Sequence, residues 1–192
     1  MFHVEQIFKL KQFKMTKIVD LEIVKKSIRN IPDFPKPGIH FKDVSSSYQD
    51  GAIFSYITNE IYEHYKDAGI TKVVGIESRG FILGSVLAYK LNAGFIPIRK
   101  PGKLPAEIYS QSYDLEYGSD TLEIHRDALE ADDIVLIHDD LLATGGTVGA
   151  AVDLIGNFGV SKIYANFFVE LDFLNGRDKI DPSVTAWSMI HF

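Results

Sequence analysis

Residues 132–147 read DDIVLIHDDLLATGGT, and this stretch decides the fold. The apolar run at 134–137 is bounded by acidic residues and predicts a buried strand. Asp139 and Asp140 follow it, and Gly145 and Gly146 then open an amphipathic helix. A strand, an acidic pair, a glycine turn and a helix in this order predict an α/β unit that binds its ligand beyond the end of the strand.

The turn from Ala143 to Thr147 is suited to bind a phosphate. Glycines let the backbone turn tightly and bring its N–H groups close to an anion. The helix start adds unpaired N–H donors, and Thr144 and Thr147 add hydroxyl groups. Asp139 and Asp140 would repel a phosphate, so their expected partners are sugar hydroxyls or a metal ion. The alternative is an ordinary tight loop beside two solvated carboxylates.

Two common nucleotide motifs are absent from this turn. No lysine follows the glycines, so it is not a Walker A loop, and its glycine spacing is not that of a G-x-G-x-x-G dinucleotide fingerprint. NTPase and dehydrogenase functions therefore lose their main support.

The bulk composition fits one globular domain. The chain has 192 residues, 46% of them hydrophobic, a balance typical of an α/β protein. A net charge of -6 argues against general binding to nucleic acid and requires an anionic ligand to be captured by local groups. The absence of cysteine excludes disulfides, cysteine-zinc sites and thiol catalysis. The six histidines show no i, i+4 pairing, which makes a histidine metal site unexpected.

The sequence also predicts a cytoplasmic protein without membrane contact. No apolar stretch approaches the ~20 residues of a membrane span. Residues 1–14 fit neither a secretory signal nor an anchor, and an organelle-targeting segment is the weaker alternative. Met15 is a second candidate start, so we treat residues 1–17 as an N-terminal extension.

Strand and helix patterns alternate along the rest of the chain. Helices are expected at 18–30, from Ile53 to Gly69, at about 80–92 and after Gly146. Residues 31–38 hold three prolines and a glycine and predict an ordered loop. Strands are expected at 72–76, 95–99, 134–138 and 162–170. Such alternation predicts a parallel sheet with helices on its faces.

The pattern changes between residues 107 and 126. Tyr109, Gln111, Tyr113 and Leu115 alternate with polar residues, and a turn follows at 118–120. This predicts a hairpin rather than a crossover, and a long insertion of this kind is a candidate active-site lid.

Charged residues stand at the ends of three predicted strands. Arg79 lies just past one strand, Arg99 closes another, and the pair Asp139-Asp140 follows a third. Because ligands of open parallel sheets bind beyond the carboxyl ends of the strands, we expect these groups to converge on one site.

The motif at 139–147 resembles the signature of the type I phosphoribosyltransferases, which bind phosphoribosyl pyrophosphate (PRPP). Further blocks resemble the adenine phosphoribosyltransferases in order and spacing, and the likeness covers about residues 20–192. These blocks are PDFPKPG at 32–38, FKD at 41–43, SRGF at 78–81, RKPGKLP at 99–105 and LEYG at 115–118. The motif indicates the superfamily, and the other blocks point to adenine.

The resemblance implies a fold and an activity. The fold is the Rossmann-like α/β type I phosphoribosyltransferase fold, a single domain at 18–192 with a hood at about 18–45 and a flexible hairpin lid at about 100–127. The activity is purine salvage, in which adenine and PRPP give AMP and pyrophosphate. A homodimer is implied, as is Mg²⁺ bound mainly through the substrate, without a dedicated metal site.

The resemblance also implies roles for single residues. The ribose and 5′-phosphate would be bound by Asp139, Asp140, Ala143, Thr144, Gly145, Gly146, Thr147 and Tyr117. The pyrophosphate would be bound by Arg79, Arg99, Lys100 and Lys103, some of which could act across a subunit interface. Adenine would meet His40, Phe41, Lys42 and Leu141, with the Phe41 ring stacked on the base. Glu116 would be the catalytic carboxylate.

The residues alone leave plainer alternatives open. The basic segment 99–103 could be a solvated turn, and 78–81 a structural one. Phe41 could be a core aromatic, and Glu116 a solvated hairpin residue. His138 could orient Asp139 or simply finish its strand, and we favour the second.

Two other functions compete with adenine transfer. One is another purine or pyrimidine phosphoribosyltransferase, and the other is a PRPP-sensing binding module without turnover. A sensor would be expected to lack the lid carboxylate or to carry a DNA-binding domain. Glu116 is present, and the roughly 18 residues before the first family-like helix cannot form such a domain, which favours an enzyme.

Overall fold

The computed structural model describes residues 18–114 and 118–192. The chain forms two compact units, residues 1–57 and 58–192, and the first is described from residue 18 onward. The prediction of a single domain with a hood stays a prediction.

The first unit pairs short helices with a two-stranded sheet. Its elements are α2 (Leu21–Ser27), β1 (Arg29–Pro32), β2 (His40–Asp43) and α3 (Ser45–Tyr48). The Asp20 carboxylate caps α2 by accepting a 2.8 Å hydrogen bond from the N–H of Ile23. The helix is shorter than predicted, because residues 29–32 pair antiparallel with 40–43 instead of continuing it.

The second unit contains a five-stranded parallel sheet, which confirms the predicted fold class. Helix α4 (Gly51–Tyr65) leads into this unit and ends before the predicted Gly69. The strand order is β4-β3-β7-β8-β9. The strands are β3 (Lys72–Ile76), β4 (Gly94–Ile98), β7 (Ile134–Leu142), β8 (Lys162–Glu170) and β9 (Thr185–His191). The helices α5 (Gly80–Leu91) and α6 (Gly146–Gly156) join them, and the predicted hairpin is β5 (Ile108–Asp114) with β6 (Ser119–His125).

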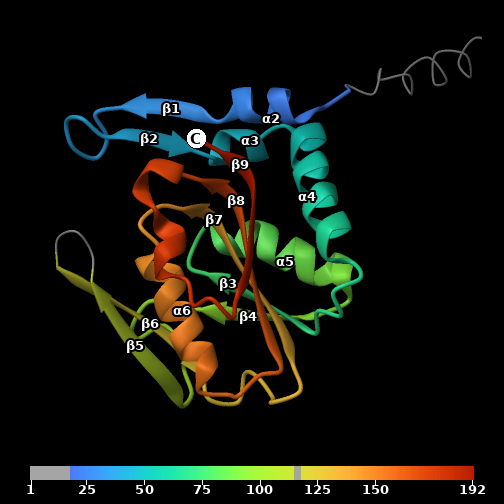
Figure 1. Cartoon of the computed structure of the whole chain (residues 1–192), viewed down its shortest axis with the longest axis vertical. Helices are drawn as coiled ribbons and strands as arrows, with labels where there is room; N and C mark the ends of the chain where they lie inside the picture. The colour runs from blue at the N-terminus through green and yellow to red at the C-terminus, as the bar shows by residue number, and fades with distance from the viewer. Residues whose placement is uncertain (1–17, 115–117) are drawn as a thin grey trace, which may run out of the picture. The chain divides into compact units, whose positions relative to one another are not determined.

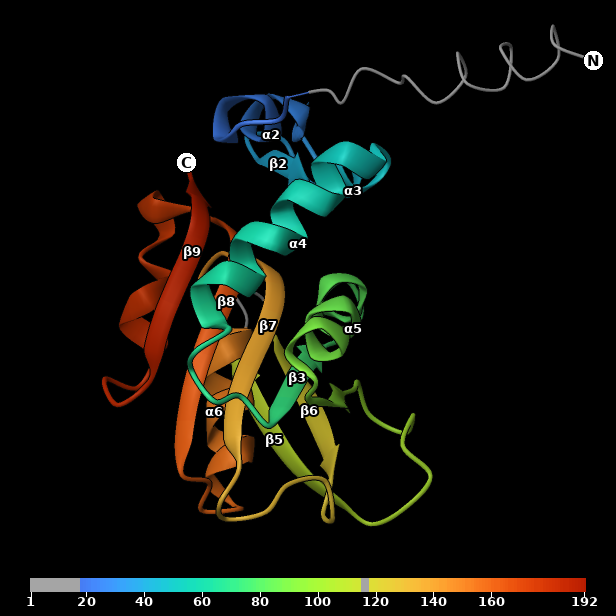
Figure 2. The same ribbon diagram turned by 90° about the vertical axis from the view of Figure 1, so that its right-hand side faces the viewer.

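Helices α5 and α6 cover opposite faces of this sheet (Figures 1 and 2). On one face, Ile76 and Ile137 pack in a buried apolar cluster with Val148 of α6 and Leu122 of the hairpin. On the other face, the Phe81 ring of α5 meets the Phe95 ring edge-on, at 5.9 Å between centroids. Because successive side chains of a strand point to opposite faces, the strands contribute side chains to the packing against both helices.

Two features of the second unit differ from the prediction. Strand β7 continues beyond 138, because Asp139, Leu141 and Leu142 still pair with β8. The acidic pair therefore lies within the strand and not after it. Strand β9 was not predicted. It is preceded in the chain by the 3-10 helix η2 (Gly176–Lys179), whose Arg177 donates two 2.7 Å hydrogen bonds to the buried carboxylate of Glu170.

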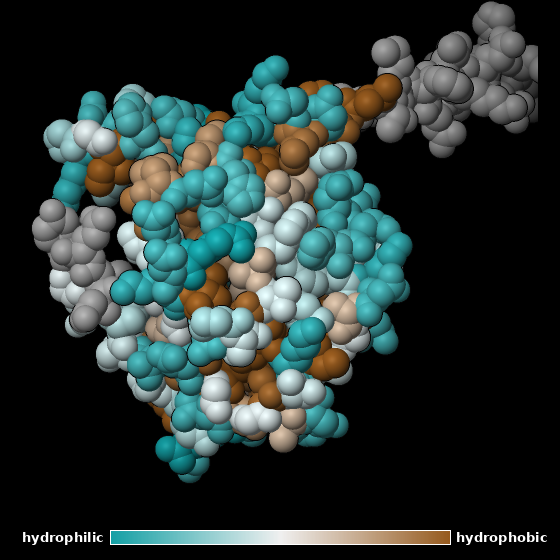
Figure 3. Space-filling model, in the orientation of Figure 1, coloured by the Kyte–Doolittle hydropathy of each residue, from teal (hydrophilic) through white to brown (hydrophobic). Residues whose placement is uncertain are grey.

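The described residues contain no helix that is long and apolar enough to cross a membrane. On the face drawn in Figure 3, hydrophobic patches are separated by hydrophilic surface.

Candidate active site

The carboxyl ends of β3, β4 and β7, which are neighbours in the sheet, bring the predicted charged groups together. Arg79 follows β3, and its Nε lies 2.9 Å from Oδ2 of Asp140 on β7. Arg99 follows β4, and its Nε donates a 2.9 Å hydrogen bond to Glu77, at the end of β3. This edge of the sheet thus carries charged groups of both signs.

The acidic pair is held close to the start of α5. Asp140 is 2% exposed, whereas Asp139 is half-buried and faces a pocket. A Cβ atom on Gly80, the first residue of α5, would lie 2.7 Å from the carbonyl oxygen of His138 and 3.2 Å from Oδ1 of Asp139. Only glycine allows the helix to start this close to the strand.

The charge of Asp139 is poorly compensated. Its Oδ1 accepts a 2.9 Å hydrogen bond from the N–H of Asp140. Burial and the neighbouring Asp140 charge nevertheless raise the pKa of Asp139 well above its ordinary value, against the opposing effects of that hydrogen bond and of Arg79. Hydroxyl donors or a cation placed at this carboxylate would relieve the penalty.

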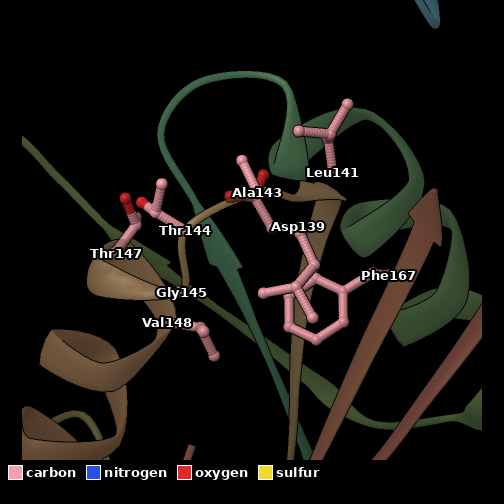
Figure 4. Close-up of a pocket in the computed structure, with 9 residues that line it drawn as sticks. Asp139, Leu141, Ala143, Thr144, Gly145, Thr147, Val148 and Phe167 are labelled. Atoms are coloured by element: carbon pink, nitrogen blue, oxygen red, sulfur yellow. The ribbon is translucent and has the colours of Figure 1, made fainter. Parts of the chain in front are cut away.

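A pocket of about 70 Å³ lies between Asp139 and the start of α6. Figure 4 shows Thr144 and Thr147 on its helix side, with Asp139 and Phe167 on its strand side. The turn between them contributes Ala143 and Gly145 to the pocket lining and leads directly into the first residues of the helix. Leu141, near the end of β7, also lines the pocket. Free N–H groups at a helix start and two hydroxyls suit an anion.

The turn at Gly145 is fixed by a second glycine far along the chain. Gly145 has a φ of +80°, and a Cβ atom there would lie 2.1 Å from the carbonyl oxygen of Gly176. A Cβ atom on Gly176 would in turn lie 2.2 Å from the carbonyl oxygen of Ala143. The two backbone segments therefore pack against each other without side chains between them.

The basic segment 99–103 is already paired with carboxylates of the same chain. Glu77 accepts hydrogen bonds from Nε of Arg99 and the N–H of Lys100, both at 2.9 Å, and it forms an ion pair with Lys103. These hydrogen bonds, that of Arg99 foremost, lower the pKa of Glu77 to about 2. The Nζ of Lys100 forms an ion pair with Asp120 on β6.

Tyr113 links this segment to the helix start. Its hydroxyl accepts hydrogen bonds of 3.3 Å from Oγ1 of Thr147 and 3.4 Å from Nζ of Lys100, and donates one of 3.4 Å to Asp120. The hairpin thus connects the expected 5′-phosphate turn with the expected pyrophosphate segment. We did not predict this link. The alternation of residues 109–115 predicts the hairpin but does not show which of its side chains reach the site.

His138 does not orient Asp139. Its ring is fully buried, and Nδ1 lies 2.8 Å from Oδ1 of Asn166 on β8. Because the Asn166 amide donates to the carbonyl of Trp187, its oxygen is the acceptor and His138 carries the proton on Nδ1. Burial lowers the pKa of His138 to about 4, so the ring is neutral. Because β7 continues to Leu142, His138 lies inside the strand, and the alternative that we favoured, that it ends the strand, is wrong.

Three of the residues predicted to meet adenine lie on β2. In the first unit, the Phe41 ring meets that of Phe34 edge-on at 5.2 Å, and His40 Nδ1 lies 3.5 Å from the amide of Asn30. Lys42 is half-buried on the same strand. Glu116 and Tyr117 lie outside the described residues.

Within the described part of the chain, one cluster has metal-ligating side chains in reach of one another: Glu170, Asp172 and His191. Its three side chains already have hydrogen-bond partners. Glu170 accepts a hydrogen bond from Arg177, and His191 Nδ1 lies 2.8 Å from Oδ1 of Asp172. None of the three lines the pocket. The cluster is therefore part of a polar network at the ends of β8 and β9, in which Arg177 and Glu170 form the ion pair.

Comparison with known proteins identifies close relatives. Residues 45–189 match the model of the phosphoribosyl transferase domain family. An adenine phosphoribosyltransferase from Bacteroides thetaiotaomicron is 56% identical over 90% of this chain and 98% of its own length. The crystal structure of an adenine phosphoribosyltransferase from Rhodothermus marinus matches with a TM-score of 0.84 and 46% identity, over 90% of this chain and 98% of that one. The Giardia lamblia enzyme, solved with 9-deazaadenine, matches with a TM-score of 0.87 and 43% identity, over 91% and 99% of the two chains.

We expect Asp139→Asn to stabilise the folded protein near neutral pH. A raised folded-state pKa means that ionising Asp139 costs stability as the pH rises through that pKa. The variant lacks this cost, so its Tm should exceed that of the parent at neutral pH and converge with it below about pH 4. Each kcal/mol gained raises Tm by about 2–4 °C in a chain of this size.

Asp181→Asn is the matched control, measured in the same thermal scans. Hydrogen bonds from Ser183 lower the pKa of Asp181, so this substitution should reduce stability at neutral pH. A lower Tm for Asp139→Asn at neutral pH would mean that the carboxylate supports the fold.

Proposed function

We infer that this chain, which belongs to the adenine phosphoribosyltransferase family, transfers the phosphoribosyl group of PRPP to adenine and releases AMP and pyrophosphate. It is an enzyme of purine salvage. The observation in its own structure that best supports this is the pocket shared by Asp139 and the start of α6. One side of this pocket suits sugar hydroxyls, and the other suits a phosphate.

We propose that the ribose 5-phosphate half of PRPP occupies this pocket. Asp139 and Asp140 would accept hydrogen bonds from the ribose hydroxyls, which gives the uncompensated charge of Asp139 two donors. The 5′-phosphate would accept hydrogen bonds from the backbone of Gly145 and Gly146 and from the hydroxyls of Thr144 and Thr147. The family resemblance alone assigns Tyr117 to the same 5′-phosphate site.

The pyrophosphate is assigned to the basic groups at the same sheet edge. Arg79 is paired with Asp140, and 38% of its side chain is exposed. Arg99, Lys100 and Lys103 follow the adjacent strand, and Lys103 is the most exposed of these three, at 47%. Their positive charge favours departure of pyrophosphate with the bonding electron pair of the C1′–oxygen bond.

The base is assigned to Phe41 and its neighbours. We propose that the Phe41 ring stacks on adenine, and that a backbone carbonyl and N–H near His40 meet its amino group and adjacent ring nitrogen. Lys42 and Leu141 belong to this assignment by resemblance. Hypoxanthine presents a carbonyl and an N–H at the same edge. The backbone carbonyl would then face a carbonyl, and the backbone N–H would face an N–H, so neither hydrogen bond could form.

Transfer requires adenine N9 to bond to C1′ while pyrophosphate leaves and the base gives up a proton. Positive charge builds on the ribose as the bond to pyrophosphate breaks. We propose that the Glu116 carboxylate accepts a hydrogen bond from the imidazole edge of adenine, helps to place that proton and stabilises the charge.

We also propose that the reaction needs Mg²⁺. The acidic pair fits this ion, because carboxylate oxygens are its preferred protein ligands and the raised pKa of Asp139 signals negative charge that a cation would relieve. Asp139 and Asp140 could hold the ion together with oxygens of PRPP. When bound, Mg²⁺ neutralises charge on the departing pyrophosphate.

The activity is tested by measuring AMP formation from PRPP with adenine, hypoxanthine, guanine and orotate as alternative bases. We expect kcat/KM for adenine to exceed that for hypoxanthine by about 10⁴-fold, as sites built around hydrogen bonds discriminate. Excess chelator should abolish the activity, and added Mg²⁺ should restore it.

Comparable rates with adenine and hypoxanthine would refute the assigned base site. Full activity in chelator would refute the need for Mg²⁺. Tight PRPP binding without turnover of any base would favour the sensor alternative.

Glu116 is tested separately, through Glu116→Gln and Glu116→Ala. Both should lower kcat by about 10²-fold or more, with a much smaller change in PRPP affinity, because the carboxylate is needed as charge develops. PRPP binding measured by calorimetry provides the comparison. Normal turnover by both variants would leave Glu116 as a solvated hairpin residue.

We propose that two copies of this chain associate through the exposed side of α5. Ile82 and Tyr89 are 42% and 86% exposed on this helix, and Ser85 lies on the same side. The helix begins one residue after Arg79, so a partner on it would be next to the active site. Such a partner could supply basic residues across the interface, as the resemblance implies.

Sedimentation velocity tests this association. The parent protein should have about twice the mass of the 21.5 kDa chain, and Tyr89→Glu should shift it toward the monomer, because a charge would be buried at the interface. Phe173→Glu, at a 69% exposed aromatic outside α5, should leave the mass unchanged. A monomeric parent protein would refute the proposal. The cytoplasmic location stays a prediction for cell fractionation to test.

A further inference from the structure

Lys100 is held by two side chains of the β5–β6 hairpin. Its Nζ forms an ion pair with the Asp120 carboxylate and donates a 3.4 Å hydrogen bond to the Tyr113 hydroxyl. Tyr113 itself donates a hydrogen bond to Asp120. The two residues face each other across the hairpin in its strand register.

This arrangement differs from that of the other cations in the segment. Arg99 and Lys103 share Glu77, whose carboxylate also accepts the N–H of Lys100 and is 10% exposed. Glu77 therefore shapes the backbone of the segment as well as balancing its charge. Asp120 contacts no backbone N–H of the segment in the structure described here; its backbone partner is the N–H of Thr121 on its own strand. Its carboxylate acts on the segment through the Lys100 ammonium.

The Lys100–Asp120 pair is accessible to solvent. The Lys100 side chain is 34% exposed and that of Asp120 is 29% exposed. An ion pair at this exposure contributes little to stability. An anion from solution can therefore reach the ammonium and replace the carboxylate at small cost.

The network also places the ammonium toward the phosphate turn. The Tyr113 hydroxyl accepts a hydrogen bond from Lys100 and another from Thr147, which lies in the first turn of α6. The Tyr113 ring packs against the apolar cluster under α6, which fixes the hydroxyl in place. Lys100 is thus oriented toward the place where a substrate with both a 5′-phosphate and a pyrophosphate has to lie.

We propose that Asp120 is a resident counter-ion which the pyrophosphate group displaces from Lys100, and which thereby sets the affinity of the enzyme for pyrophosphate and PRPP. This inference rests on the proposed function, because it requires Lys100 to bind pyrophosphate. Asp120 orients and neutralises the ammonium in the free enzyme. It then competes with the substrate for the same donor.

Asp120→Asn tests the proposal, because asparagine keeps the shape and the acceptor for Thr121 but loses the charge. Titration calorimetry with pyrophosphate in Mg²⁺ buffer should give about two- to fivefold tighter binding than the parent protein. The KM for PRPP should fall by a similar factor, while the KM for adenine should not change. Tightening distinguishes competition from a structural role, since a damaged site would bind more weakly.

Asp127→Asn is the matched control. Asp127 is exposed just beyond the end of β6, so its substitution makes the same change in net charge away from Lys100. It should leave pyrophosphate affinity unchanged. In a Lys100→Met background, Asp120→Asn should no longer tighten binding, because the donor for which it competes is gone.

Unchanged or weaker binding by Asp120→Asn would overturn the proposal. Equal tightening of pyrophosphate binding by Asp127→Asn, or by Asp120→Asn in the Lys100→Met background, would also overturn it. Either result would show that the change in net charge, and not competition for Lys100, raises the affinity. These results differ from failure of the proposed function, in which the parent protein itself would neither bind pyrophosphate nor form AMP.

Discussion

The charges at the carboxyl edge of the sheet have to balance one another in the free protein, and much of the local structure serves this requirement. Arg79 is paired with Asp140, and Arg99 with Glu77. Parallel strands bring these groups into proximity because their ends meet at one edge. The carboxylates of Glu77 and Asp140 are nearly buried, so leaving either of them without its cationic partner would strongly destabilise the fold. Asp139 is less well compensated and keeps a raised pKa. We take the raised pKa of Asp139 as a sign of a ligand site, because carboxylates with perturbed pKa values are common in pockets where ligands bind.

The shape of the turn at 143–147 depends on a different constraint, the close packing of two backbones. Gly145 and Gly176 approach so closely that a Cβ atom on either would overlap a carbonyl oxygen. Gly176 lies in the segment between β8 and β9, and Arg177 beside it is bound to Glu170 and to the carbonyl of Ala186. The last part of the chain thus supports the turn from behind. The position of the N–H groups at the start of α6 therefore depends on residues that never face the pocket.

The sequence predicts the fold well where the signal is local. The ranges 72–76 and 162–170 match the observed strands, since buried apolar runs bounded by polar residues leave little choice. The sequence predicts the bounds of an element poorly where they depend on pairing with another strand. Residues 29 and 30, predicted as the end of a helix, and residues 31 and 32, predicted in a loop, form β1 because β2 pairs with them. Strand β7 extends to Leu142 because β8 continues beside it. The site follows the same division. The acidic pair and the glycine turn are contiguous and can be recognised, whereas the contacts of Tyr113, Asp120 and Gly176 depend on segments far apart in the sequence.

A chain with a net charge of -6 has to bind a highly anionic substrate without exposing a strong positive field. Unpaired cations would bind it most tightly, but Arg99, Lys100 and Lys103 are too close together to stand unpaired without repelling one another. Pairing each with a carboxylate reduces that repulsion. If these cations bind the substrate as proposed, substrate binding becomes an exchange of one anion for another. The affinity then depends on the difference between two pairings and not on the full attraction of either. On the proposed assignment, this exchange lets the same cations attract PRPP and release pyrophosphate after transfer, because the internal carboxylates remain beside them throughout the cycle.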